Sequence, residues 1–301
     1  MPRLIDPGEG APIALAELLD ALAAASDCDV RDEEAFAALG PLLARLGHNR
    51  DFLADLAMDE LKSRCAGQRG GNGYGAQVFL LHPPDGRFLV RANFWPARAD
   101  PLVRASGAAA FFYDLPHDHN FPFLTFGYLG PGYWSDYFEY DADALAGLPG
   151  ENARLRFVER ARLEPGRLML YRMRRDIHVQ LPPDAFSVSL NILGADPAQP
   201  WLDQYRFDIS RGVIAEGLTC TAAEALLTVA AHIGNGRDLA AAFARGHPCE
   251  RMRTTALDAL LAVEPHTAQP LLRLAADAPS TYLAGYARAR FAAIEAGFSP
   301  P

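Results

Sequence analysis

The pattern of apolar and polar positions changes twice along the chain and divides it into three zones. From residue 12 to about 67, leucines recur at steps of three and four, as in Leu15, Leu18, Leu19 and Leu22. This spacing is typical of amphipathic helices, and Asp32 and Asn49 or Asp51 stand where helix N-caps are expected. Glycines between residues 67 and 75 then interrupt the pattern.

The middle zone, from residue 76 to about 208, has a residue pattern typical of an antiparallel β domain. Short runs rich in Val, Ile, Phe, Tyr and Trp alternate with turn residues, without helices between them. Residues 83–86 (Pro-Pro-Asp-Gly) predict a turn between the first two runs, and Pro131-Gly132 predicts a hairpin turn. The predicted strands are 77–82, 88–95, 109–114, 123–129, 133–140, 154–163, 167–173, 178–181, 187–193 and 204–208. About ten strands in this arrangement favour a sandwich or barrel over a βαβ sheet.

The last zone, from Thr221 onward, is rich in alanine and helical in pattern. Asn235-Gly236, residues 246–248 and residues 278–280 separate its helices. The stretch from His247 to Asp277 resembles one unit of a HEAT-type helical repeat, and a plain helical bundle fits it about equally well. We therefore expect a helical region over 1–75, a β-barrel over 76–210 and a second helical region over 211–301.

Composition narrows the range of partners and compartments. The 28 basic and 37 acidic residues leave a formal charge of −9, which argues against a general nucleic-acid binder. The four cysteines are scattered without a CxxC pair, as in a reduced cytoplasmic chain. The N-terminus lacks an apolar leader and no stretch approaches the ~18 apolar residues of a membrane span, so we expect neither secretion nor membrane insertion.

The strongest chemical signal is the segment Pro116-His117-Asp118-His119. Two histidines at i and i+2 on a strand point to the same face, and neutral imidazole binds Fe, Zn, Cu or Ni. Downstream, a Pro165-Gly166 turn and an apolar strand lead to His178, which opens another strand.

These residues resemble the two motifs of the cupin superfamily, in which HxH and a later histidine bind a metal inside a jelly-roll β-barrel. The resemblance covers residues 76–208 and implies His117, His119 and His178 as the ligands. The position of the family's glutamate ligand holds Phe123 or Leu124, so the site would contain histidines alone. In this respect it is similar to three-histidine, cysteine-dioxygenase-like oxygenases, which implies Fe(II), with Zn, Ni or Mn as alternatives. A departure follows at Ser187–Asn191, where those enzymes carry His and Tyr after the serine.

Three further residues are candidates for a catalytic role. Arg91 lies in an otherwise apolar strand and would receive an anionic substrate if it pointed inward; otherwise Phe88 and Val90 fill the core and Arg91 is exposed. Tyr128 and Tyr133 offer phenols for proton transfer or orientation. Asn120 and Gln180 are candidates to orient a ligand imidazole.

Three functions remain open at this point. The first is a non-haem iron dioxygenase that combines O2 with a small anionic or thiol-containing substrate. The second is a non-redox metallo-cupin, such as an isomerase. The third is a cupin sensor or scaffold whose C-terminal helices bind a partner protein. Superfamily members often pair through sheet edges, which implies a homodimer unless the flanking helices cover those edges.

Overall fold

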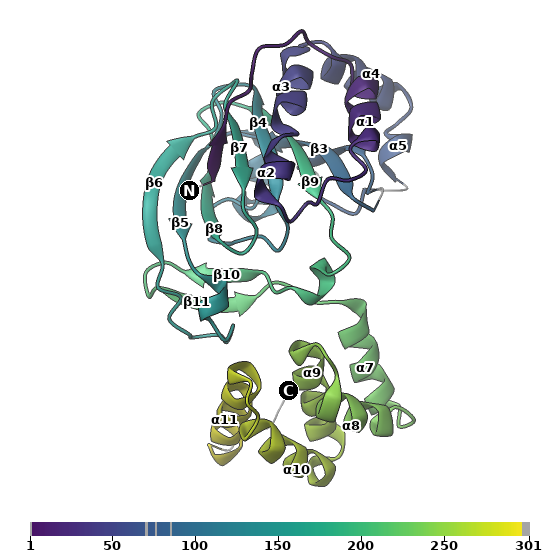
Figure 1. Cartoon of the computed structure of the whole chain (residues 1–301), viewed down its shortest axis with the longest axis vertical. Helices are drawn as coiled ribbons and strands as arrows, with labels where there is room; N and C mark the ends of the chain where they lie inside the picture. The colour runs from purple at the N-terminus through teal and green to yellow at the C-terminus, as the bar shows by residue number, and fades with distance from the viewer. Residues whose placement is uncertain (1, 70–71, 76, 85, 297–301) are drawn as a thin grey trace. The chain divides into compact units, whose positions relative to one another are not determined.

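The chain packs into two units, described separately below. The computed structural model describes residues 2–69, 72–75, 77–84 and 86–296 (Figure 1). The first unit comprises residues 1–141, 154–199 and 206–212, and the second comprises residues 142–153, 200–205 and 213–301. Asp85 of the predicted turn at 83–86 and Ala76, the first residue of the predicted barrel, lie outside the described residues.

The N-terminal zone of the first unit is helical, as its leucine spacing predicts. Asp32 caps α2, because its carboxylate accepts hydrogen bonds from the backbone N–H groups of Glu34 and Ala35 at 2.9 and 3.1 Å. The Asn49 side chain accepts from Phe52 N at the start of α4 in the same way. The helices are α1 (Leu15–Ala24), α2 (Glu33–Ala37), α3 (Gly40–His48), α4 (Phe52–Lys62) and α5 (Ala66–Arg69).

The larger sheet has six strands in the order β1-β7-β4-β9-β3-β2, and every neighbouring pair is antiparallel. Its strands are β1 (Arg3–Ile5), β2 (Val78–His82), β3 (Phe88–Trp95), β4 (Phe123–Leu129), β7 (Leu168–Tyr171) and β9 (Ser187–Gly194).

The second sheet has the order β6-β5-β8 and is also antiparallel. Isolated bridges pair His117 with His178 of β8 and with Arg206 of β10. A separate pair is formed by β10 and β11. The strands are β5 (Trp134–Glu139), β6 (Arg156–Arg162), β8 (Asp176–Leu181), β10 (Tyr205–Asp208) and β11 (Val213–Gly217).

The six-stranded sheet is buried on both faces, which explains the nearly continuous apolar run of β3. On one face, Phe88, Val90 and Ala92 pack with the leucines of α1 and α3 in a single apolar core. Figure 1 shows these helices on one side of the sheet. On the other face, Leu89 and Trp95 join an aromatic cluster with Tyr137 and other residues of the second sheet. Two antiparallel sheets with a shared interior, flanked by helices, are consistent with a cupin-like β fold; the jelly-roll connection stays a prediction.

Three predictions about the middle zone are wrong. The zone was expected to have no helix between its strands, but α6 (Pro101–Ser106) lies between β3 and β4. Residues 109–114 do not form a strand: residues 109–111 belong to the 3₁₀ helix η1 (Ala108–Phe111), and Gly107, Phe112 and Asp114 take positive φ angles of 80°, 57° and 61°. Pro131-Gly132 does turn the chain, but β4 and β5 lie in different sheets and so do not form a hairpin. The chain crosses between the sheets at this turn.

The second unit consists mainly of helices packed around α9, which contacts α7, α8, α10 and α11. Its helices begin and end near the predicted breaks, and Ser280 caps α11 through Leu283 N at 3.1 Å. The helices are α7 (Ala222–His232), α8 (Arg237–Gly246), α9 (Glu250–Val263), α10 (Pro265–Ala276) and α11 (Thr281–Glu295). Whether they form a HEAT-type repeat stays a prediction. Among the described helices, none is long and apolar enough to span a membrane.

Candidate metal centre

Three histidines from two segments meet in the interior between the sheets. His117 and His119 lie in the connection before β4, and His178 lies on β8. The backbone joins these segments, because His117 N donates to His178 O at 3.2 Å and His178 N donates to His117 O at 3.0 Å. The HxH segment is therefore an isolated bridge followed by irregular chain, not the regular strand that the i, i+2 spacing predicts.

The side-chain nitrogens converge on one point. Nε2 of His178 lies 3.1 Å from Nε2 of His117 and 3.1 Å from Nε2 of His119. Nδ1 of His117 lies 2.8 Å from the carbonyl oxygen of Leu115. Because a carbonyl only accepts, Nδ1 carries the proton, and Nε2 of the neutral ring presents its lone pair to the cluster.

Burial keeps these imidazoles neutral. His117 and His178 are buried, and desolvation lowers the pKa of His117 to about 4. Desolvation also lowers the pKa of His119 and of His178 well below the ordinary value, and the neighbouring histidines lower both further. Neutral imidazole is the form that binds a metal ion.

The cluster fits a metal ion better than it fits a set of hydrogen bonds. One ligand atom from each histidine lies within 4.8 Å of the others. Two nitrogens bound about 2.1 Å from one ion are about 3 Å apart when their bonds meet near a right angle, close to the observed 3.1 Å. The three residues therefore form a metal-binding site, and imidazole nitrogen suits iron, zinc, copper or nickel alike.

Aromatic rings surround the histidines and limit access of water. The ring of Phe121 lies 4.9 Å from that of His119, and the ring of Phe123 also lies 4.9 Å from it. Tyr171 stacks on Phe123 at 4.3 Å and meets His178 edge to face at 4.9 Å. Such a shell fixes the ring orientations and lowers the local dielectric constant.

A row of polar side chains crosses the inner face of the six-stranded sheet. It begins at Thr125, two residues along β4 from Phe123 of the aromatic shell. Thr125 of β4 is paired with Asn191 of β9, and Asn191 is paired with Arg91 of β3. Asn93 follows on β3, and Gln180 lies on β8 two residues after His178. Asn93, Thr125 and Asn191 were not predicted as site residues. Their signal in the sequence is polar residues at alternating positions, 91 and 93 or 189 and 191, within apolar strands.

Arg91 points into this interior, on the same side of β3 as Leu89 and Trp95. Its guanidinium carbon lies 5.1 Å from the centroid of the Tyr74 ring. Desolvation lowers its pKa, and its charge in turn contributes to lowering the pKa of His119. Tyr74 is a hydrogen-bond partner of the Arg91 side chain, and no carboxylate of the described residues is among the groups that act on its charge.

The two candidate tyrosines lie on opposite sides of the six-stranded sheet. Tyr133 is buried in the inner cluster, where its hydroxyl lies beside Tyr171, Gln180 and Thr125, and burial raises its pKa. Tyr128 packs on the helical side, and its hydroxyl donates to Asn49 O at 3.2 Å and to Arg50 O at 2.8 Å. The structure thus brings Tyr133 and Arg91 towards the histidines and does not bring Tyr128.

Both buried carboxylates near the histidines already have partners. Asp118 accepts a hydrogen bond from the Tyr140 hydroxyl. Asp176 accepts from the backbone N, Nε and Nη2 of Arg172 at 2.8, 2.9 and 2.5 Å. Of the two residues expected to orient an imidazole, Asn120 instead donates to Gln199 O at 3.0 Å.

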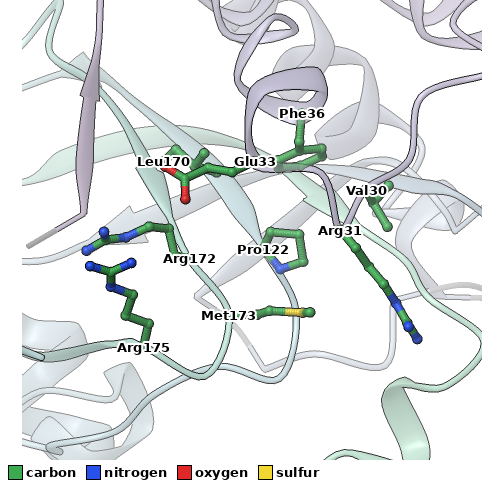
Figure 2. A pocket seen from close by; sticks show the side chains of 9 residues that line it. All are labelled: Val30, Arg31, Glu33, Phe36, Pro122, Leu170, Arg172, Met173 and Arg175. Atoms are coloured by element: carbon green, nitrogen blue, oxygen red, sulfur yellow. The ribbon is translucent and has the colours of Figure 1, made fainter. Parts of the chain in front are cut away.

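A surface hollow of about 200 Å³ lies beside the loop of residues 172–175, which precedes β8 and its ligand His178 (Figure 2). Pro122, three residues after His119, and the loop residues Arg172, Met173 and Arg175 form part of its wall. The same loop contacts the HxH segment directly, because Arg174 N donates to His119 O at 2.8 Å. The remaining lining residues are Val30, Arg31, Glu33, Phe36 and Leu170.

No protein-family model and no curated protein sequence matches the chain. Among solved structures, it is similar to the DMSP lyases RdDddP and RnDddQII (13% identity, 44% of this chain and 52% of the other, TM-score 0.25). It is also similar to the DMSP lyase DddQ from Ruegeria pomeroyi DSS-3 (14%, 65% and 78%, TM-score 0.25). A third is a Pseudomonas putida prolyl-4-hydroxylase (18%, 62% and 86%, TM-score 0.23).

The chain thus spans about half the length of the first of these structures. TM-scores of 0.25 and below are too low to assign a fold family. The cupin-like character of the chain rests on its own two antiparallel sheets and its histidine cluster.

Proposed function

We propose that the protein is a non-haem iron oxygenase that combines O2 with a small anionic substrate. The observation that carries the proposal is the convergence of three neutral imidazoles in the interior that also holds the buried cation of Arg91. His117, His119 and His178 would hold Fe(II), which supplies redox chemistry with O2 that side chains lack. Three neutral ligands leave the charge of the ion intact, and this charge favours an anion beside it.

The residues around the histidines have defined tasks in this proposal. Arg91 attracts and orients the anionic group of the substrate, because no described carboxylate competes for its guanidinium. Tyr133 stays a neutral phenol at neutral pH, since burial raises its pKa, and so it donates a hydrogen bond to substrate. Phe121 and Phe123 keep water from the reacting groups.

The same interior favours oxygenation over a non-redox isomerisation. An isomerase needs a side chain that accepts a proton near neutral pH. Asp118 and Asp176 are engaged by Tyr140 and Arg172, and the pKa values of Tyr133, Tyr137 and Tyr171 are raised by burial. Among the described interior residues, none outside the histidine cluster is arranged as such a base.

The test combines metal analysis with oxygen uptake. The purified protein, loaded anaerobically with Fe(II), should consume O2 when small carboxylic and thiol acids are added, and zinc-loaded protein should not. His178→Ala should abolish iron binding, whereas His266→Ala, on the exposed side of α10, should leave it unchanged. A chain that retains its metal after His178→Ala, or that holds iron without consuming O2, would overturn the proposal.

A further inference from the structure

Buried polar atoms without partners gather in the interior between the sheets. Buried polar groups in folded proteins nearly always have hydrogen-bond partners, so a cluster of exceptions in one place indicates that a ligand supplies them. The side chains are deep, with 2% of Asn191 and 7% of Asn93 exposed. The atoms without a partner are Arg91 Nε, Asn93 Oδ1 and Asn191 Nδ2, whereas Thr125 and Gln180 lie beside the Tyr133 hydroxyl and Ser135 lies beside the Tyr137 hydroxyl.

The strand register places most of these side chains close together. Arg91, Asn191 and Thr125 occupy directly paired positions on three adjacent strands, and strands in a sheet lie about 4.8 Å apart. Gln180 faces them from the second sheet, two residues or about 7 Å along β8 from His178. A small molecule with one end at the histidines would therefore reach this row with its other end.

The row has one formal positive charge and otherwise neutral groups. Arg91 and the amide nitrogen of Asn191 donate, whereas the amide oxygen of Asn93 accepts. A carboxylate beside Arg91 would satisfy the donors, but the Asn93 oxygen needs an N–H or O–H from the ligand. An ammonium group is disfavoured there, because the ligand and Arg91 would then bring two buried positive charges against the single carboxylate of the ligand.

Building on the proposed function, we propose that Asn191 and Asn93 determine substrate specificity by binding a neutral hydrogen-bonding group next to the anionic group held by Arg91. The substrate class is then a small hydroxy acid or carbamoyl acid. An amino acid would bring a second positive charge to Arg91, and an unsubstituted aliphatic or aromatic acid would leave the amide oxygen of Asn93 unpaired.

Four three-carbon acids separate these classes by calorimetric titration of the Fe(II)-loaded protein without O2. Propionate carries the anion alone, 3-hydroxypropionate adds a hydroxyl, malonamate adds a carboxamide and β-alanine adds an ammonium group. We expect 3-hydroxypropionate and malonamate to bind about three- to tenfold more tightly than propionate, the effect of one net hydrogen bond. β-Alanine should bind more weakly than propionate.

Two substitutions assign the preference to residues. Asn191→Leu removes the amide while approximately keeping its volume, and should abolish the preference for 3-hydroxypropionate with propionate binding retained. Arg91→Met should weaken the binding of all four acids. Asn152→Leu, an exposed amide of the second unit, is the matched control and should change neither.

The outcomes distinguish this inference from the proposed function. If propionate binds through Arg91 but 3-hydroxypropionate and malonamate bind no better, or β-alanine binds best, the inference is overturned and the anion site stands. If Asn191→Leu retains its metal and the full preference, Asn191 is not the specificity residue. If iron-loaded protein binds none of the acids, the anion site itself fails. Because the four-acid comparison uses the unsubstituted protein, it remains decisive even if a variant does not fold.

Discussion

Replacing Asp176 by asparagine should destabilise the loop that joins the metal ligands. The Asp176 carboxylate is fully buried and accepts three hydrogen bonds from Arg172, whose side chain is 15% exposed and which also contacts Glu139 at 2.8 Å. Asparagine keeps one acceptor oxygen, but removes the charge and turns an amide N–H₂ towards a guanidinium. Breaking a buried ion pair costs about 3–5 kcal/mol. Because Glu139 remains, we expect the free energy of unfolding to fall by about 2–4 kcal/mol.

The effect should extend to the metal. Residues 172–175 connect Asp176 to the HxH segment through the bond from Arg174 N to His119 O, and His178 follows two residues later. Loosening this loop shifts two of the three ligands, so metal affinity should fall by about tenfold or more, as for other supporting residues of metal sites.

Urea unfolding of the metal-free protein, followed by tryptophan fluorescence, measures the first effect, and a competitive metal titration measures the second. Asp114→Asn is the control, because Asp114 pairs with Arg98 at 2.9 Å on the surface, with about half of each side chain or more exposed. That pair should contribute about 0–1 kcal/mol. If the two variants unfold at the same urea concentration with equal slopes, the stabilising role assigned to Asp176 is refuted.

Three other predictions follow from the packing of the sheets. Tyr128→Phe should lower the free energy of unfolding by about 1 kcal/mol without altering iron-dependent oxygen uptake. Tyr133→Phe should slow oxygen uptake, because Tyr133 lies in the interior that holds the histidines. The reverse result would contradict the placement of the two tyrosines on opposite sides of the six-stranded sheet. Burial raises the pKa of Tyr133, Tyr137 and Tyr171, so the unfolded chain releases these protons first and stability should fall as pH rises above about 10. Absorbance and circular dichroism would follow this titration, and ionisation of all ten tyrosines near pH 10 in a folded protein would contradict it. Gly47→Ala would place a methyl group 2.2 Å from the Phe126 ring and should cost about 1–3 kcal/mol by thermal denaturation, unlike Gly217→Ala, which meets nothing within 4 Å.

Local sequence patterns predicted most of the strands and helices. The strands at 88–95 and 123–129 agree with β3 and β4 at both ends, because bulky β-forming residues lie between clear turns. β1 was missed, since three residues are too few to show a period, and it forms only by pairing with β7. The error at 109–114 arises from positive φ angles at Phe112 and Asp114, which non-glycine residues rarely adopt and which pattern alone does not reveal.

The sequence predicted which residues form the candidate site better than it predicted how they are arranged. Histidine spacing and the cupin resemblance identified His117, His119 and His178, but their meeting depends on pairing between residues about 60 positions apart. Alternation left two orientations open for Arg91, and both faces of β3 proved to be buried. Tyr128 and Tyr133 could not be distinguished, because the chain passes from one sheet to the other between them.

The two buried faces of β3 have a consequence for how this protein can change. Phe88, Val90 and Ala92 hold the helices onto the sheet, while Arg91 and Asn93 face the histidine interior. Because neighbouring residues of β3 point to opposite faces of the sheet, a substitution at 91 or 93 alters the histidine interior without removing a contact with the helices. Substrate preference can therefore diverge during evolution, or in a mutant library restricted to the inward-facing positions. Selection for folding acts meanwhile on the residues that face the helices, Phe88, Val90 and Ala92.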